Sequence, residues 1–427
     1  MFDKGEGMSI GDIRKHQEKM LRDVVRYAYD NVPLYREKFK SAGITPEDIR
    51  SLDDLEKIPF TTKNNLRAAY PYGLLAVGID RVVRFHASSG TTGKPTVVPF
   101  TSNDIEVQSL LMARSLSTAT VTKDDIVQNA YTYGLFTGGL MFHYGAEKLG
   151  AAVIPSATGN TRRQIEIMRD MRTTVLCCTP SYTMRIKEVA NEMGLEPSKD
   201  FSLRVGVFGA EPWSEGMRKK IENALGLEAF DMYGLSELGG PGVAIECSEH
   251  DGLHVWSDHY IVEVIDPKSG EVLGEGEKGE LVFTTLTKEA MPLLRYRTRD
   301  ISSIIPGTCS CGREHPRISR IEGRSDDMLI VGGINVFPSA IEEVLSRFSE
   351  LGSEYQIVVD RDVLDHLLVR AEVVDKSVDR KSLAKRVAEE LQAVLAIRAR
   401  LELVDEGTLP RAEGKAKRVI DLRKGKI

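Results

Sequence analysis

The chain has 427 residues, of which 41% are hydrophobic and 28% charged, and its formal net charge is −6 at pH 7. This composition is ordinary for a globular protein, and the length suits a large domain followed by a small one. Lys and Arg are scattered, whereas a nucleic-acid partner calls for a basic patch, so we expect no such partner. No apolar run approaches a membrane span, and the start lacks the apolar stretch of a signal peptide. Five cysteines make no disulfide framework in a chain this long, so a cytoplasmic location is expected.

Apolar periodicity predicts the first elements in chain order. Leu21, Val24, Val25 and Ala28 recur at helical spacing, which predicts an amphipathic helix over residues 11–30. Between about residues 80 and 235, short apolar runs alternate with helical patterns, which predicts βαβ units and a largely parallel sheet. The runs are VVRF (82–85), DIVQNAY (125–131), AAVIP (151–155), TVLCCTP (174–180) and LRVGVFGA (203–210).

The texture changes twice after this region. Residues 254–267 and 279–286 are strand-rich, and after Gly323 two helices (339–348 and 380–395) alternate with two strands (355–360 and 367–374). We place a boundary within residues 323–327. Residues 1–325 are then expected to form a large, multi-layer α/β domain with mixed sheets and helices, and residues 326–427 a small, mobile α+β lid.

A loop at residues 86–101, HASSGTTGKPTVVPFT, is rich in hydroxyl side chains and glycines. It is not a Walker P-loop, because Ser88 replaces the first glycine and Pro95 replaces the hydroxyl residue after Lys94. Glycines and successive N–H groups nevertheless suit an anion, although a Gly/Ser-rich surface loop is the common alternative. The phosphate-binding candidates are Ser88, Ser89, Gly90, Thr91, Thr92, Gly93 and Lys94.

Further segments follow this loop in order: YGLSE (233–237), YRTRD (296–300), GRSDDMLIVGGINVF (323–337) and LPRAEGKAKRVID (409–421). With them, the sequence resembles the adenylate-forming (acyl-activating) enzymes. Residues 128–151, 175–182, 207–215 and 252–259 are similar to the phenylacetate–coenzyme A ligase family in particular. The resemblance implies that the loop holds the β- and γ-phosphates of ATP while a carboxylate attacks the α-phosphorus, giving acyl-AMP and pyrophosphate. The thiol of coenzyme A would then displace AMP.

The resemblance also implies the catalytic residues. Lys415 is expected to reach the carboxylate and α-phosphate oxygens, where negative charge gathers in the transition state. Lys417 is its nearby competitor, and a basic C-terminal tail is the alternative interpretation of both. Glu237 matches the carboxylate that holds Mg²⁺, with Thr92 nearby. A lone glutamate elsewhere would more commonly be a solvated acid at a helix start.

The nucleotide and the lid have their own expected residues. Asp300 has the chemistry to accept from both ribose hydroxyls, and Arg324 matches a nucleotide-contacting arginine, although a surface salt bridge is the common alternative for either. Asp326 matches the hinge on which the lid rotates between the two steps. In the second step, Gly332 and Gly333 would lie beside the pantetheine path. Two segments after predicted strand ends would line the adenine, with Tyr233 stacking: Gly209, Ala210, Glu211, Pro212, Asp231, Met232, Tyr233 and Gly234.

Small and aromatic residues mark the expected acyl pocket, at Tyr133, Phe136, Gly240 and Pro241. Such walls suit a flat aryl group. Phenylacetate is the best single expectation, although one methylene in an apolar pocket distinguishes related acids by only ~1–3 kcal/mol. Tyr131 and Phe142, nearby, are more typical of the core.

A metal site is suggested by CSCGREH (309–315) and ECSEHDGLH (246–254). Two cysteines one residue apart are closer than the usual zinc spacing, so free cysteines are the alternative. The resemblance implies a structural Zn²⁺ on Cys247, Cys309, Cys311 and a histidine. We expect His254, and three other histidines stay open: His250, His259 and His315.

Three functions compete. The first is an AMP-forming ligase that uses ATP, Mg²⁺ and coenzyme A to make an aryl-CoA thioester. The second transfers the acyl group to a carrier-protein thiol, but the sequence contains no carrier domain. The third is a metal-stabilised protein that binds nucleotide without turnover, which an intact Lys415 and Glu237 argue against. The resemblance further implies a homodimer.

Overall fold

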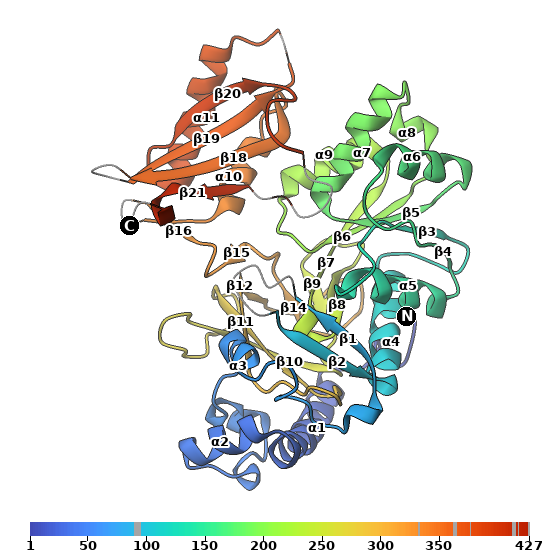
Figure 1. Ribbon diagram of the computed structural model, residues 1–427, viewed down its shortest axis with the longest axis vertical. Coiled ribbons are helices and arrows are strands. Elements are labelled where there is room, and N and C mark those ends of the chain that lie inside the picture. The colour runs from blue at the N-terminus through green and yellow to red at the C-terminus, as the bar shows by residue number, and fades with distance from the viewer. Residues whose placement is uncertain are drawn as a thin grey trace.

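The computed structural model describes residues 1–88, 95–331, 334–361, 365–375, 377–411, 416 and 418–425. Figure 1 shows a large body built from the N-terminal part of the chain and a smaller unit, coloured orange to red, built from the C-terminal part. The helices of the described residues are α1 (Ile10–Asn31), α2 (Pro33–Ala42), α3 (Lys63–Ala68), α4 (Ser102–Thr118), α5 (Thr137–Leu149), α6 (Thr161–Asp170), α7 (Pro180–Glu192), α8 (Pro197–Asp200), α9 (Glu215–Leu225), α10 (Pro338–Ser346) and α11 (Arg380–Leu395).

A nine-stranded sheet forms the centre of the body. Its strands, in spatial order, are β13 (Ile304–Ile305), β14 (Arg317–Ile318), β9 (Leu253–Val255), β8 (Gly240–Glu246), β7 (Glu228–Leu235), β6 (Val205–Gly209), β5 (Val175–Cys178), β3 (Ile126–Asn129) and β4 (Ala152–Ile154). The five strands from β7 to β4 are parallel, as the alternation of strand and helix patterns predicted. The remaining four join them in antiparallel register.

The two faces of this sheet are covered by different helices, because successive side chains of a strand point to opposite faces. In β5, Val175 and Cys177 join the cluster that contains residues of α4 and α5, whereas Leu176 and Cys178 join the cluster that contains residues of α6, α7 and α9. Both cysteines are fully buried and unpaired, so they belong to the core. Strands buried on both faces explain why the sequence shows continuous apolar runs there.

One predicted strand pairs elsewhere. VVRF begins β1 (Val82–Ala87), which pairs antiparallel with β2 (Val97–Thr101) in a separate two-stranded sheet and not with the parallel strands. The cause is the short connection, because a parallel partner needs a crossover of a dozen or more residues. As a result, residues 89–94 connect the two strands of a hairpin.

The body also contains a four-stranded sheet and the N-terminal helix α1. The sheet contains, in spatial order, β10 (Tyr260–Ile265), β11 (Gly279–Thr285), β12 (Tyr296–Ser302) and β15 (Gly323–Arg324), all antiparallel. Helix α1 spans the residues predicted to be helical and turns Leu21, Val25 and Ala28 into the main core. With β15, the chain reaches the edge of the body and passes into the C-terminal unit (Figure 1).

The C-terminal unit has its own core and mixed topology. It contains the hairpin of β16 (Leu329–Val331) and β17 (Ile334–Val336), and a sheet with the order β20 (Arg400–Asp405), β19 (Asp365–Val373), β18 (Leu351–Arg361) and β21 (Val419–Asp421). Helices α10 and α11 bury Ile341, Val344, Leu383 and Val387 against this sheet in a hydrophobic cluster separate from those of the body. The prediction of a large α/β body followed by a small α+β unit is therefore confirmed.

Candidate active site and candidate metal centre

The base of the phosphate loop is closed by Ser88 and Thr96. The Ser88 backbone N–H donates to the Thr96 carbonyl at 3.0 Å, and the Thr96 N–H donates to the Ser88 hydroxyl at 3.1 Å. The six remaining candidates of this loop lie outside the described residues: Ser89, Gly90, Thr91, Thr92, Gly93 and Lys94. The hairpin of β1 and β2 thus brings both ends of the loop together. Ser88 is the phosphate-binding candidate that lies within the described residues.

Tyr233, Asp300 and Arg324 come together from three strands. The Tyr233 hydroxyl donates to Oδ2 of Asp300 at 2.7 Å, and Nη1 of Arg324 lies 3.4 Å from Oδ1. Asp300 and Arg324 are direct neighbours across β12 and β15, which explains why residues 24 apart in sequence meet. Burial and the Asp300 charge raise the pKa of Tyr233 well above its ordinary value, so the phenol stays a donor. The structure therefore joins three of the expected nucleotide-binding residues.

The two segments expected to line the adenine are adjacent. Gly209 ends β6 and is paired with Met232 of β7, and a side chain at Gly209 would meet the Met232 carbonyl at 2.3 Å. The expectation that residues 231–234 follow a strand end is wrong, because all four lie within β7. Asp231 is buried, and burial and the Glu246 charge raise its pKa to about 6. Its nearest described cation is Arg320, 3.9 Å away, so this carboxylate belongs to a buried charge cluster.

Glu237 is buried in the short 3-10 helix η4 (Ser236–Leu238), beside residues that sequence patterns did not single out. Nζ of Lys63, in the first turn of α3, lies 3.4 Å from Oε1 of Glu237. Nζ of Lys288 donates to the Glu237 carbonyl at 2.8 Å. Within the described residues, Oε1 accepts no hydrogen bond that meets the geometric criteria and is ion-paired with Lys63, so a hard cation bound here would share this carboxylate with the Lys63 ammonium. No sequence signal identifies Lys63 or Lys288, because both meet Glu237 over more than fifty residues of chain.

The expected acyl-pocket residues lie on two segments that meet. A side chain at Gly240 would come within 2.9 Å of Cβ of Thr137, the residue that follows Phe136. The Tyr133 hydroxyl accepts from the Asn129 amide at 2.8 Å, and the Phe136 ring is 45% exposed. Pro241 follows Gly240 in β8, opposite Gly234. Tyr131 stacks on the buried Phe142 with ring centroids 4.9 Å apart, as expected of core aromatics.

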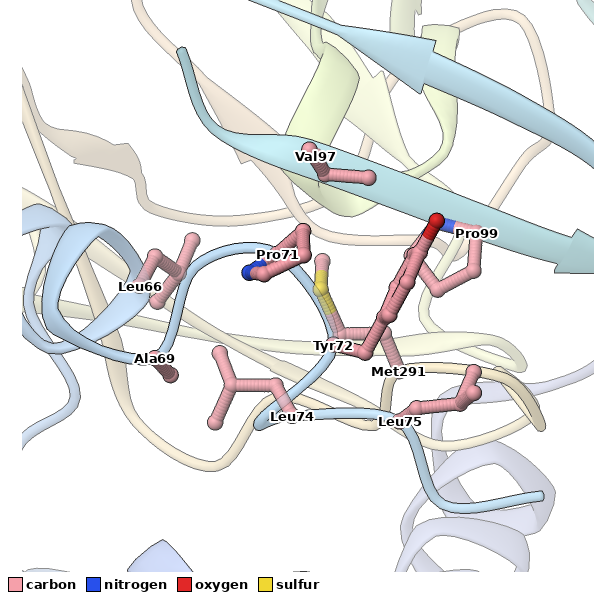
Figure 2. Close-up of a pocket in the computed structure, with 9 residues that line it drawn as sticks. All are labelled: Leu66, Ala69, Pro71, Tyr72, Leu74, Leu75, Val97, Pro99 and Met291. Carbon is pink, nitrogen blue, oxygen red and sulfur yellow. The ribbon is translucent and has the colours of Figure 1, made fainter. Parts of the chain in front are cut away.

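Two cavities open near these segments. One, of about 250 Å³ including space open to solvent, is lined by mostly apolar residues and by none of the expected site residues; Figure 2 shows Leu66 of α3 and Val97 and Pro99 of β2 among them. The other, of about 280 Å³, is lined by Leu238, Gly239 and Lys288 among other residues. The second cavity is therefore lined by direct neighbours in sequence of Glu237 and of Gly240.

Of the residues expected to act in the lid and at its hinge, Asp326 is the one within the described part of the chain. Gly332, Gly333, Lys415 and the competitor Lys417 lie outside the described residues. Asp326, the expected hinge, accepts from Nε and Nη2 of Arg324 at 2.9 and 3.0 Å. Arg324 thus contacts Asp300 of the body and the hinge carboxylate together.

The candidate metal centre gathers Cys247, His254, Cys309 and Cys311, whose ligand atoms all lie within 4.8 Å of one another. The Sγ atoms of Cys247 and Cys309 are 3.7 Å apart, and Sγ of Cys311 is 3.3 Å from Nε2 of His254. A zinc tetrahedron with Zn–S bonds of about 2.3 Å has edges of about 3.8 Å, so the donor set fits this metal.

The histidine of this centre is oriented by the backbone. Nδ1 of His254 lies 3.3 Å from the His315 carbonyl, which can only accept, so Nδ1 carries the proton and Nε2 offers its lone pair to the cysteines. The other three histidines contact different groups: His250 is beside Glu246 and Glu228, His259 beside Thr287, and His315 bonds the Gly5 carbonyl and the Ser257 N–H. Among the four candidates, His254 is therefore the one that faces the three cysteines.

Comparison with known proteins places the chain in a family. The family of AMP-binding enzymes matches residues 47–286, and the C-terminal domain of AMP-binding enzymes matches residues 333–423. Phenylacetate-coenzyme A ligase of Escherichia coli (strain K12) is 48% identical over 430 residues, which cover 99% of this chain and 98% of that protein. No helix in the described part of the chain is long and apolar enough to cross a membrane.

Two structures of one related enzyme differ in their likeness to this chain. A 2-hydroxyisobutyryl-CoA ligase in the postadenylation state, in complex with an acyl-AMP, gives a TM-score of 0.93 at 29% identity and covers 99% of this chain and 92% of its own. The same ligase with 2-HIB-AMP and CoA in the thioesterification state gives 0.74 at 30% identity over the same shares. The arrangement of body and lid is thus closer to the postadenylation structure. The chain belongs to the AMP-binding, adenylate-forming enzymes and, within them, to the phenylacetate–coenzyme A ligase family.

Proposed function

We propose that this chain is an AMP-forming ligase that converts an aryl acid, with phenylacetate as the preferred substrate, ATP and coenzyme A into the aryl-CoA thioester, AMP and pyrophosphate. The observation that carries the proposal is the convergence of Tyr233, Asp300 and Arg324 where the body meets the lid. A full-length relative that is a phenylacetate-coenzyme A ligase supports the acid and the thiol.

Binding of the nucleotide follows from the donors and acceptors at this point. The ionised Asp300 is an acceptor for two ribose hydroxyls, and Tyr233 and Arg324 hold it in place. The backbone ends of β6 and β7 form the wall for the adenine, where Gly209 leaves no room for a side chain. The loop closed by Ser88 and Thr96 receives the β- and γ-phosphates through its N–H and hydroxyl groups.

Adenylation brings a carboxylate up to a polyanion, so cations must offset the repulsion. Glu237 offers Oε1 to Mg²⁺, with Thr92 as the expected second ligand, and Mg²⁺ bound there would neutralise phosphate charge. Lys415 stabilises the charge that develops on the α-phosphate and the attacking carboxylate. Lys63 adds a further cation beside Glu237.

The second half-reaction requires a different surface of the lid. We place the domain boundary between residues 325 and 326, because β15 still pairs with β12 of the body, whereas Leu329 already belongs to the lid core. Rotation about Asp326 would withdraw Lys415 and bring Gly332 and Gly333 beside the pantetheine path. Closing the site in each position excludes water from the acyl-AMP.

The proposed enzyme also has a structural metal and a pocket for the aryl group. Zn²⁺ on Cys247, His254, Cys309 and Cys311 would be structural, because four protein ligands leave no open position for a substrate. Gly240 and Pro241 with Phe136 and Tyr133 would bind the aryl group. A homodimer and a cytoplasmic location stay predictions, and size-exclusion chromatography with light scattering would test the first.

The test is AMP release from ATP and Mg²⁺ across a panel of acids: phenylacetate, indoleacetate, benzoate and several fatty acids. Each acid is assayed with and without coenzyme A. We expect AMP and thioester only when an aryl acid and coenzyme A are both present, with phenylacetate the best substrate. Release of ADP, or no AMP with any acid, would contradict the proposed function. AMP with phenylacetate and a carrier-protein thiol in place of coenzyme A would favour the carrier-protein alternative.

A further inference from the structure

Glu211 connects the body to the lid through its two carboxylate oxygens. It lies in the turn after β6 and is partly buried. Oε1 accepts a hydrogen bond of 2.7 Å from the backbone N–H of Ser181, in the first turn of α7. Oε2 accepts one of 3.2 Å from the backbone N–H of Ala416, in the lid. Each oxygen therefore serves a different domain.

The two backbone partners of Glu211 are fixed donors, so the position requires two acceptors. A carboxylate supplies them, whereas a glutamine of the same shape supplies one oxygen and turns an NH₂ group toward the other N–H. The first turn of a helix also has N–H groups without partners in the helix and favours a negative charge. Burial raises the pKa of Glu211 above its ordinary value, and the contacts with Ser181 and Ala416 and the nearby Arg418 offset part of this rise.

Ala416 directly follows Lys415, the expected catalytic cation. We propose that Glu211 is a positioning residue for adenylation: it holds the backbone of Ala416 and through this neighbour restrains Lys415 in the first half-reaction. This inference rests on the proposed function and on the role of Lys415 within it. When the lid rotates for the second half-reaction, the hydrogen bond to Ala416 has to break, so Glu211 acts in the first half-reaction only.

Other contacts hold the lid without reaching Ala416. Glu342 of α10 accepts from the Ser214 N–H at 3.2 Å, and Glu188 of α7 pairs with Arg411 of the lid at 3.1 Å. Arg411 keeps two further bonds of 2.8 Å to Glu372, within the lid itself. Glu188→Gln thus removes one interdomain carboxylate charge and leaves both Glu211 and Arg411 bonded, which makes it the matched control.

The experiment separates the two half-reactions in wild type, Glu211→Gln, Lys415→Ala, the double variant and Glu188→Gln. Phenylacetate-dependent exchange of pyrophosphate into ATP measures adenylation. Thioester formation from synthetic phenylacetyl-AMP and coenzyme A measures the second step and reports on folding. We expect Glu211→Gln to slow adenylation about tenfold, as for one hydrogen bond to a charged group, and to slow thioester formation from the supplied adenylate much less than adenylation. Glu188→Gln should change neither rate more than about twofold.

The double variant decides whether Glu211 acts through Lys415. Residues that act as a unit lose activity non-additively, so the double variant should adenylate no more slowly than Lys415→Ala alone. Multiplied losses, an equal loss in both half-reactions, or full adenylation by either Glu211→Gln or Lys415→Ala would overturn the inference. Wild-type protein that shows neither half-reaction would instead overturn the proposed function, and the inference with it.

Discussion

Tyr233 of β7 donates a hydrogen bond of 2.7 Å to Oδ2 of Asp300 on β12. The phenol is buried, with its ring stacked on Phe283 at 6.0 Å between centroids. A rigid donor on one side and Arg324 on the other leave the Asp300 carboxylate with one orientation. If Asp300 accepts from the ribose as proposed, its carboxylate is oriented before the nucleotide binds, which lowers the ordering cost of binding.

Asp300→Asn should weaken ATP binding, because the amide accepts with one oxygen and places its NH₂ group against Arg324 or the Tyr233 hydroxyl. We expect the KM for ATP to rise about 10- to 100-fold, with the KM for phenylacetate changed much less. Tyr233→Phe, which removes one oxygen only, should give a smaller rise. Steady-state kinetics with each substrate varied in turn make the measurement, and an equal rise in both KM values would contradict the assignment.

Gly240→Ala should narrow the acyl pocket. Gly240 has φ +123°, and an added Cβ would lie 2.9 Å from Cβ of Thr137, so the segment after Phe136 must shift. We expect the KM for phenylacetate to rise about tenfold, as for overpacking, while the KM for ATP stays within about twofold. Gly194→Ala is the control, because φ there is +74° with open space around it. If Gly194→Ala raised the KM for phenylacetate equally, backbone strain and not the pocket would be the cause.

Cys309→Ala should remove the metal. Purified wild-type protein is expected to contain about one zinc per chain, and the variant close to none, with the thermal midpoint lowered by on the order of 5 °C. Cys178→Ala removes a buried cysteine outside the metal centre, so its zinc content should equal that of wild type even where stability falls. Elemental analysis and calorimetry give both values. Zinc-free wild-type protein with an unchanged midpoint after chelation would contradict the site.

Lys288 should make stability depend on pH in the alkaline range. Burial lowers its pKa from 10.5 to about 8, against the opposing charges of Asp104 and Glu237. Below pH 8 the native and unfolded chains both hold the proton, whereas between pH 8 and 10.5 only the unfolded chain does. The free energy of unfolding of wild type should therefore rise relative to Lys288→Met by ~1–3 kcal/mol between pH 8 and 10. Urea unfolding of both proteins at four pH values is the measurement, and a constant or falling difference would refute it.

Local patterns predicted most of the helices and strands, whereas contacts between residues distant in sequence could not be predicted from them. Helix α11 has the predicted bounds, because its apolar spacing is purely local. The sequence predicted that VVRF is a strand but not that it pairs antiparallel with β2, which follows from the short connection between the two strands. The sequence assigned Asp231 to a nucleotide-binding segment, whereas its burial beside Glu246 could be seen only in the structure. The contacts of Lys63 with Glu237 and of Glu211 with Ala416 could not be predicted from local patterns, because each joins residues more than 170 positions apart.

Arg324 contacts both Asp300, the carboxylate proposed to bind the ribose, and Asp326, the proposed hinge. If a bound nucleotide strengthens one of these two contacts at the expense of the other, it also changes the free-energy difference between the lid positions. By thermodynamic linkage, the factor by which bound nucleotide favours one lid position equals the factor by which that position tightens the nucleotide. In the proposed reaction ATP becomes acyl-AMP before the lid turns, so a change in the contacts of Arg324 at that step would couple the chemistry at the nucleotide to the position of the lid.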